Sequence, residues 1–183
     1  DVFKNIFVSL AYEREMIKDY FTKNNPDSFN MAFIDTGLKS LTGERIRLLT
    51  EHLDGEDFMV TYGDGVANVD IKKLLEFHQT QNTIGTITGV HPATRFGLIE
   101  KDEQTKKIKG FHQVTVVSMS RDRENIQEIR HIPSKDYING GFMVFNKEFF
   151  NYLKPGDKIE DALARLIPEK QLALYKHDGF WYG

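Results

Sequence analysis

Apolar and polar positions follow two different periods along the first half of the chain. Short apolar runs rich in β-branched residues predict buried strands, and these cover residues 5–10, 31–35, 57–64 and 83–90. Apolar residues that recur every three or four positions predict amphipathic helices between the strands, over residues 12–21, 43–55 and 70–81. The alternation favours an α/β fold, with a mostly parallel sheet and helices on both of its faces.

The helices carry the more detailed expectations. The apolar face of the first helix is predicted to hold Met16, Ile17, Tyr20 and Phe21. In the third helix, Asp70 is a good N-cap, and the buried face is predicted to hold Ile71, Leu74, Leu75 and His78.

The second half of the chain has a different order of elements. Residues 96–102 and 106–117 resemble two strands of a hairpin, and the highly charged stretch 120–131 is typical of a solvated helix or loop. A strand that runs into a short helix is predicted over 137–150, an amphipathic helix over 159–167, and a strand with a bend over 172–183. Since the sequence contains no repeat or linker, we expect one domain over 1–183 with a small antiparallel elaboration.

Two glycine-containing motifs stand where strands are predicted to end or bend. Asp64 lies between Gly63 and Gly65 at the carboxyl end of a strand, where α/β proteins place active residues. This motif suits a ligand of a metal ion or phosphate, and it also suits an ordinary turn. Asn139 and Gly140 equally fit a hairpin turn or a strand that something approaches closely.

Composition narrows the classes of protein. The net charge of -3 offers no basic field for nucleic acid, and a chain without cysteine has no disulfide or thiolate chemistry. No apolar stretch approaches the roughly 20 residues of a membrane span, and residues 1–10 lack the features of a signal peptide. We therefore expect a cytoplasmic protein with no nucleic-acid or membrane partner.

The chemistry left open is that of oxygen ligands. The six histidines show no metal-ligand spacing, and the sequence contains no nucleophile elbow, G-x-G-x-x-G motif or Walker loop. A hard cation such as Mg²⁺, held by one or two carboxylates and by substrate phosphates, is the remaining candidate.

Five segments together resemble the sugar-1-phosphate nucleotidylyltransferases, and among them most closely the glucose-1-phosphate cytidylyltransferases. These segments occur in the order of the family and span nearly the whole chain: DTGLKSLTGERI (35–46), TYGDGVANVDI (61–71), RFGLIE (95–100), INGGFMVFN (138–146) and DGFWYG (178–183). The resemblance implies a Rossmann-like three-layer nucleotidyltransferase fold.

The resemblance also implies roles for individual residues. Asp64 matches the aspartate that binds Mg²⁺, and Asn139 matches the residue that faces the sugar phosphate, with Gly140 giving it room. Ser40 and Arg45 match positions near the nucleotide.

Four further positions match the sugar side of the family's site. Phe96 and Gly97 match a loop whose backbone approaches the hexose. Glu160 matches an acid at a helix start that hydrogen-bonds sugar hydroxyls, and Trp181 lies in the segment that leads to a second metal-binding aspartate.

The implied reaction joins CTP and glucose 1-phosphate into CDP-glucose, with release of pyrophosphate. The resemblance further implies Mg²⁺ as cofactor, a homo-oligomer, and a place in the synthesis of bacterial dideoxysugars of the lipopolysaccharide O-antigen. Two alternatives stay open at this point. One is uridylyl or thymidylyl transfer by a relative with the same fold, and the other is a non-catalytic paralogue that binds nucleotide sugars.

The sequence departs from the family in three places. The glycine-rich loop GGxGTR is absent, no EKP segment follows Phe111, and the chain ends at Gly183 before the second metal aspartate. We therefore expect that these residues belong to a longer enzyme and that the domain is incomplete at both ends.

Overall fold

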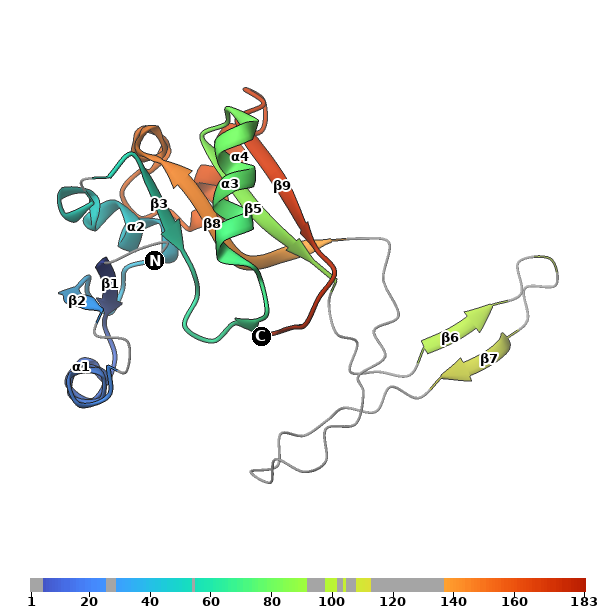
Figure 1. Ribbon diagram of the computed structural model, residues 1–183, viewed down its shortest axis with the longest axis horizontal. Helices are drawn as coiled ribbons and strands as arrows, with labels where there is room; N and C mark the ends of the chain where they lie inside the picture. The colour runs from blue at the N-terminus through green and yellow to red at the C-terminus, as the bar shows by residue number, and fades with distance from the viewer. Residues whose placement is uncertain are drawn as a thin grey trace.

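The computed structural model describes residues 5–25, 29–53, 55–91, 98–101, 104, 108–112 and 137–183. Its centre is a four-stranded sheet in the order β3-β8-β5-β9 (Figure 1). These strands comprise Asp57–Val60 (β3), Ile138–Asn146 (β8), Gly85–Val90 (β5) and Leu172–His177 (β9). β5 and β9 are parallel, whereas β8 runs antiparallel to both of its neighbours.

Helices cover both faces of this sheet, and β8 carries the core between them. Met143 and Phe145 belong to a core cluster with α2 (Thr42–Leu48), α4 (Ile159–Leu166) and the 3-10 helix η2 (Lys147–Tyr152). Val144 points to the opposite face, where it packs with Leu74 of α3 (Ile71–Gln81). Successive residues of a strand face opposite sides, so one fully buried stretch of β8 serves both halves of the core.

A separate pair of strands lies beside the main sheet (Figure 1). β1 (Asn5–Leu10) and β2 (Asn30–Asp35) are parallel, and the chain between them includes α1 (Arg14–Lys23). α1 buries none of its residues, and Met16 and Tyr20 are 63% and 60% exposed. The helix itself is confirmed, but its predicted apolar face is not buried within the described part of the chain, where Ile17 is at most half-buried.

Two short antiparallel pairs complete the description. β6 (Leu98–Lys101) and β7 (Ile108–His112) form the predicted hairpin. β4 (Val66–Ala67) pairs with β10 (Trp181–Tyr182), and a 3-10 helix, η1 (Thr50–His52), follows α2. The charged stretch 120–131 lies outside the described residues. Within the described ranges, every helix is too short or too polar to cross a bilayer.

The α/β class with helices on both faces is therefore confirmed. The sheet differs from the prediction in detail, because the central position of β8 makes it mixed, so antiparallel pairing is not limited to a peripheral elaboration. The strand predicted over 57–64 ends at Val60, since a turn begins after Tyr62. Asp70 caps α3 as predicted, accepting a hydrogen bond from the Lys73 backbone N–H at 3.1 Å.

Candidate active site

Asp64 lies on an exposed turn that follows β3. Its two neighbouring glycines are uncrowded, because a Cβ atom built on Gly63 or Gly65 meets no described atom within 4 Å. Neither glycine is among those with a positive φ in the described part of the chain. The backbone and packing of the described residues therefore do not require glycine at either position, and the turn is open to an approaching ligand.

Asn139 and Gly140 lie inside β8, at a bulge opposite β5. Ile87 pairs with Met143 and Gly89 with Asn139, so the three residues 140–142 lie opposite Thr88 alone. A Cβ atom on Gly140 would lie 2.6 Å from Cγ1 of Val90, which is closer than packed atoms come. Of the two interpretations that the sequence left open, the structure supports close approach within a strand and excludes a hairpin turn.

Trp181 connects this bulge to the segment after Asp64. The indole N–H of Trp181 donates to the carbonyl oxygen of Gly140 at 2.8 Å. The same residue pairs with Ala67 in the short β4–β10 ladder, three residues beyond Asp64. Trp181 therefore links the bulge of β8 to the short strand that follows the Asp64 turn.

Tyr62 lies among the predicted site residues, although sequence reasoning did not single it out. Burial raises the pKa of its phenol, and the charges of Glu160 and Asp64 raise this pKa further, while a hydrogen bond with Asn139 lowers it. Asn139 thus contacts this phenol, and the charges of two further predicted residues from separate elements act on it. The signal that could have identified Tyr62 in the sequence is its place directly before the Gly-Asp-Gly turn.

Glu160 is exposed on the first turn of α4, and the start of α4 contacts the start of α2. The Thr42 hydroxyl accepts a hydrogen bond from the Ile159 backbone N–H at 2.9 Å. A Cβ atom on Gly43 would lie 2.8 Å from the carbonyl oxygen of Lys158, so only glycine allows this approach. The two helix starts are therefore packed backbone to backbone.

An ion pair fastens the loop that leads into α4. Arg165 donates two hydrogen bonds to the carboxylate of Asp157, one of them at 3.0 Å. The Arg165 hydrogen bond is the main reason that the pKa of Asp157 falls from 3.8 to about 2. This pair places the first turn of α4, and with it Glu160.

Ser40 and Arg45 shape the loop that follows β2. The guanidinium group of Arg45 donates to the Thr36 hydroxyl at 2.8 Å and to the Gly37 carbonyl at 3.3 Å. The Ser40 hydroxyl donates to the carbonyl oxygen of Thr36. Thr36 is only 3% exposed and also bonds to the Ser9 hydroxyl at 2.6 Å, so it is the centre of this network. Sequence reasoning did not single out Thr36 for this role.

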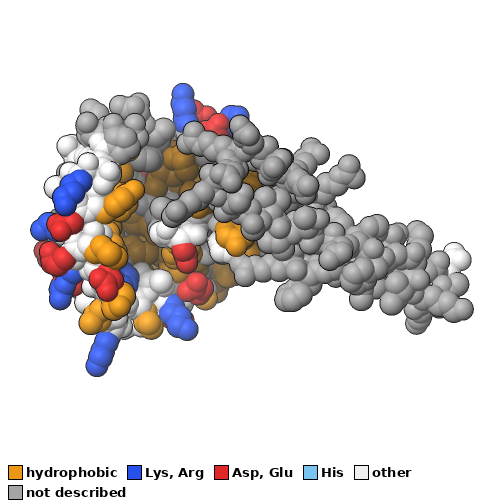
Figure 2. All heavy atoms as spheres, turned by 90° about the horizontal axis from the view of Figure 1, so that it is seen from below, with side chains coloured by type: hydrophobic (Ala, Val, Ile, Leu, Met, Phe, Trp, Pro, Cys, Tyr) orange, Lys and Arg blue, Asp and Glu red, His pale blue; other side chains and the backbone are white. Residues whose placement is uncertain are grey.

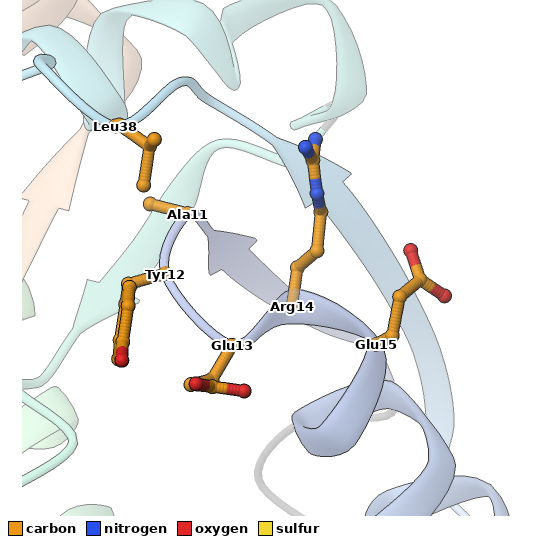
Figure 3. A pocket seen from close by; sticks show the side chains of 6 residues that line it. All are labelled: Ala11, Tyr12, Glu13, Arg14, Glu15 and Leu38. Atoms are coloured by element: carbon orange, nitrogen blue, oxygen red, sulfur yellow. The ribbon is translucent and has the colours of Figure 1, made fainter.

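A pocket of about 310 Å³ adjoins the same loop at the end of β1. Figure 3 shows Leu38 of the loop reaching toward Ala11, with Tyr12 and Glu13 on the far side. None of the predicted site residues lines this pocket. Figure 2 shows a second feature, a face on which apolar side chains gather around a hollow.

The predicted residues fit a hard cation only if protein and substrate share its coordination. The described residues include no cluster of three His, Cys, Asp or Glu side chains able to enclose a metal ion. Asp64 offers one exposed carboxylate, and substrate phosphates commonly complete the coordination of Mg²⁺ in such sites. Phe96 and Gly97 lie outside the described residues.

Comparison with known proteins gives consistent matches along the chain. The model of the nucleotidyl transferase family matches residues 1–182. A probable glucose-1-phosphate cytidylyltransferase of Bacillus subtilis is 30% identical, over 94% of this chain and 69% of its own length. The glucose-1-phosphate cytidylyltransferase of Salmonella typhi is 27% identical, over 97% of this chain and 72% of its own length.

Solved structures agree on the fold. HddC from Yersinia pseudotuberculosis, complexed with GMP-PN, superposes with a TM-score of 0.65 at 20% identity, over 98% of this chain and 72% of that chain. A UDP-glucose pyrophosphorylase complexed with UDP-glucose superposes with a TM-score of 0.64 at 13% identity, over 98% of this chain and 75% of that chain. At these identities the likeness establishes the Rossmann-like nucleotidyltransferase fold.

Proposed function

The chain belongs to the nucleotidyl transferase family, and we propose that it transfers a cytidylyl group from CTP to glucose 1-phosphate. The observation that supports this proposal is that Asn139 contacts the phenol of Tyr62, whose pKa the charges of Asp64 and Glu160 also raise. These three residues are the ones matched to phosphate, metal and sugar. The choice of CTP and glucose 1-phosphate is supported by the names of the relatives from Bacillus subtilis and Salmonella typhi.

In the proposed reaction, an oxygen of the sugar 1-phosphate attacks the α-phosphorus of CTP. The new P–O bond forms as the bond to the β-phosphate breaks, and pyrophosphate leaves with the electron pair. The attacking oxygen is already ionised near neutral pH, so the reaction needs no general base. The protein's task is to align two polyanions and to neutralise their charge.

Each residue then has one task. The amide nitrogen of Asn139 donates to the incoming phosphate, since its Oδ1 atom already accepts from the Gly141 N–H at 3.0 Å. Glu160, at the start of α4, accepts hydrogen bonds from the sugar hydroxyls. Arg45 keeps the loop after β2 in shape for the nucleotide through its bonds to Thr36 and Gly37.

We also propose that Asp64 holds Mg²⁺ together with the phosphates of CTP. A bound Mg²⁺ ion would supply Lewis-acid stabilisation of charge at the α-phosphate. The open surroundings of Gly63 and Gly65 support this assignment, because they leave room for a phosphate chain beside the carboxylate.

The test is pyrophosphate release by the protein with Mg²⁺ and glucose 1-phosphate, in parallel reactions with CTP, UTP and dTTP. We expect the highest rate with CTP. If the rate were highest with UTP or dTTP, the proposed base would be wrong and the proposed type of reaction would stand. Binding of CDP-glucose without release from any nucleotide would contradict the proposal and leave a nucleotide-sugar-binding protein.

A further inference from the structure

We propose that Tyr62 is a positioning residue for the sugar 1-phosphate: its ring fixes the bulge of β8, and its hydroxyl fixes the side-chain amide of Asn139. The inference rests on the proposed function for the identity of the substrate. The geometry that supports it belongs to the protein alone.

The ring of Tyr62 lies directly on the bare backbone of Gly141. A Cβ atom on Gly141 would come within 2.7 Å of Cδ2 and 3.3 Å of Cε2 of this ring. Gly141 also has a φ of +80°, a conformation that side-chain-bearing residues adopt only with strain. An aromatic ring in this place therefore fills the space left by the missing side chain and keeps the bulge in one conformation.

The bulge in turn determines how Asn139 presents its amide. Oδ1 of Asn139 accepts a hydrogen bond from the Gly141 N–H at 3.0 Å. That bond directs the oxygen inward and leaves the NH₂ group as the donor. On the other side, Trp181 holds the Gly140 carbonyl at 2.8 Å. The Tyr62 ring and the Trp181 indole thus fix the backbone next to Asn139.

The hydroxyl of Tyr62 supplies the last constraint. The phenol is in hydrogen-bonding contact with the side chain of Asn139. Since Oδ1 of Asn139 already accepts from the Gly141 N–H, the NH₂ group is the donor left for the phenol oxygen. A phenol accepts a hydrogen bond and donates its own proton, and it can therefore link Asn139 to a further acceptor.

The variant Tyr62→Phe separates the two functions of this residue, because it keeps the ring on Gly141 and removes only the hydroxyl. Losing one hydrogen bond that orients the phosphate donor should raise KM for glucose 1-phosphate by about 10-fold. KM for CTP should change by less than about 2-fold, and the melting temperature should remain that of the wild type, because ring packing is retained.

Tyr152→Phe is the matched control. Tyr152 donates its hydroxyl to the carboxylate of Glu169, and the charges that act on its phenol are those of Glu169 and Glu148, neither of which is a predicted site residue. Its loss should leave both KM values unchanged. Equal KM values for glucose 1-phosphate in Tyr62→Phe and Tyr152→Phe would overturn the inference, and so would an equal rise of both KM values in Tyr62→Phe.

A second readout does not depend on turnover. The side-chain NH₂ signals of Asn139 in a ¹⁵N–¹H correlation spectrum should shift in Tyr62→Phe and stay in place in Tyr152→Phe. Unshifted signals in Tyr62→Phe would overturn the inference even in an active enzyme. If the wild type released no pyrophosphate with any nucleotide, the proposed function would fail, and this spectrum would still decide the position of Asn139.

Discussion

Two glycine-containing motifs of this protein look alike in sequence and differ in their surroundings. At Gly140 and Gly141, the side chains of Val90 and Tyr62 occupy the space where a Cβ atom would lie. At Gly63 and Gly65 the corresponding space is empty of described atoms. The protein's own packing therefore explains the first pair, whereas for the second pair we propose that the turn is kept open for a ligand.

The largest expected effect comes from the carboxylate on the open turn. Asp64→Asn removes the negative charge that we assign to Mg²⁺ and should lower kcat at least about 100-fold, with an unchanged melting temperature. Calorimetric titration of Mg²⁺ in the presence of CTP should show weaker binding. Asp70→Asn is the control, because asparagine also caps a helix well. Near-normal turnover in Asp64→Asn would remove the metal assignment.

The next effect concerns the crowded motif. Gly141→Ala combines a positive φ with a clash against the Tyr62 ring, and it should cost about 2–4 kcal/mol of unfolding free energy. Gly156→Ala shares the φ of +80° but meets nothing within 4 Å, so it isolates the strain of the backbone alone. Urea unfolding of both variants measures the difference. Equal losses of unfolding free energy in the two variants would show that the Tyr62 ring can move aside without an energetic penalty.

A smaller effect on the open motif would sharpen the contrast. Gly65→Ala should leave the unfolding free energy within about 0.5 kcal/mol of the wild type, because its methyl group enters open space. The same methyl group would stand in the path of the phosphate chain, and KM for CTP should therefore rise. A loss of stability with unchanged KM would make this turn structural.

The smallest expected effect is a pH dependence of the unfolding free energy that arises from His78 of α3. His78 bonds to the Thr86 hydroxyl of β5 at 2.8 Å, and burial lowers its pKa from 6.5 despite the charge of Asp57. As the pH falls below 6.5, the unfolded chain gains a proton that folded His78 does not accept, so stability decreases. The slope of unfolding free energy against pH should be smaller in His78→Gln, and an identical slope would contradict this assignment.

The sequence predicted local structure well where the decisive interactions are local. Asp70 caps α3, and Leu74 and His78 of its predicted face are 0% and 4% exposed. The same periodicity predicted a buried face for α1, yet Met16 and Tyr20 are exposed. Periodicity shows that a helix is amphipathic, but only contacts between distant segments decide whether another element covers its apolar face.

Pairing of distant strands was harder to predict for the same reason. The direction of β8 depends on which strands it joins, and its partners, Asp57–Val60 and Gly85–Val90, lie far away in sequence. For the site, motif matches named Asp64, Asn139 and Glu160, and their shared effect on Tyr62 is visible only in the structure. Tyr62 and Thr36 lie in matched segments but were missed, because their roles depend on contacts with distant residues, Gly141 for Tyr62 and Ser9 for Thr36.

The central place of β8 also governs the order in which the molecule can fold during synthesis. Both β3 and β5 hydrogen-bond to β8 and not to each other, so the two earlier strands have no shared partner until Asn146 has been made. Domains generally fold as units on the ribosome. The main sheet can therefore close only after β8 has been made, and until then the apolar residues of β3 and β5 lack the strand that they pair with in the native sheet.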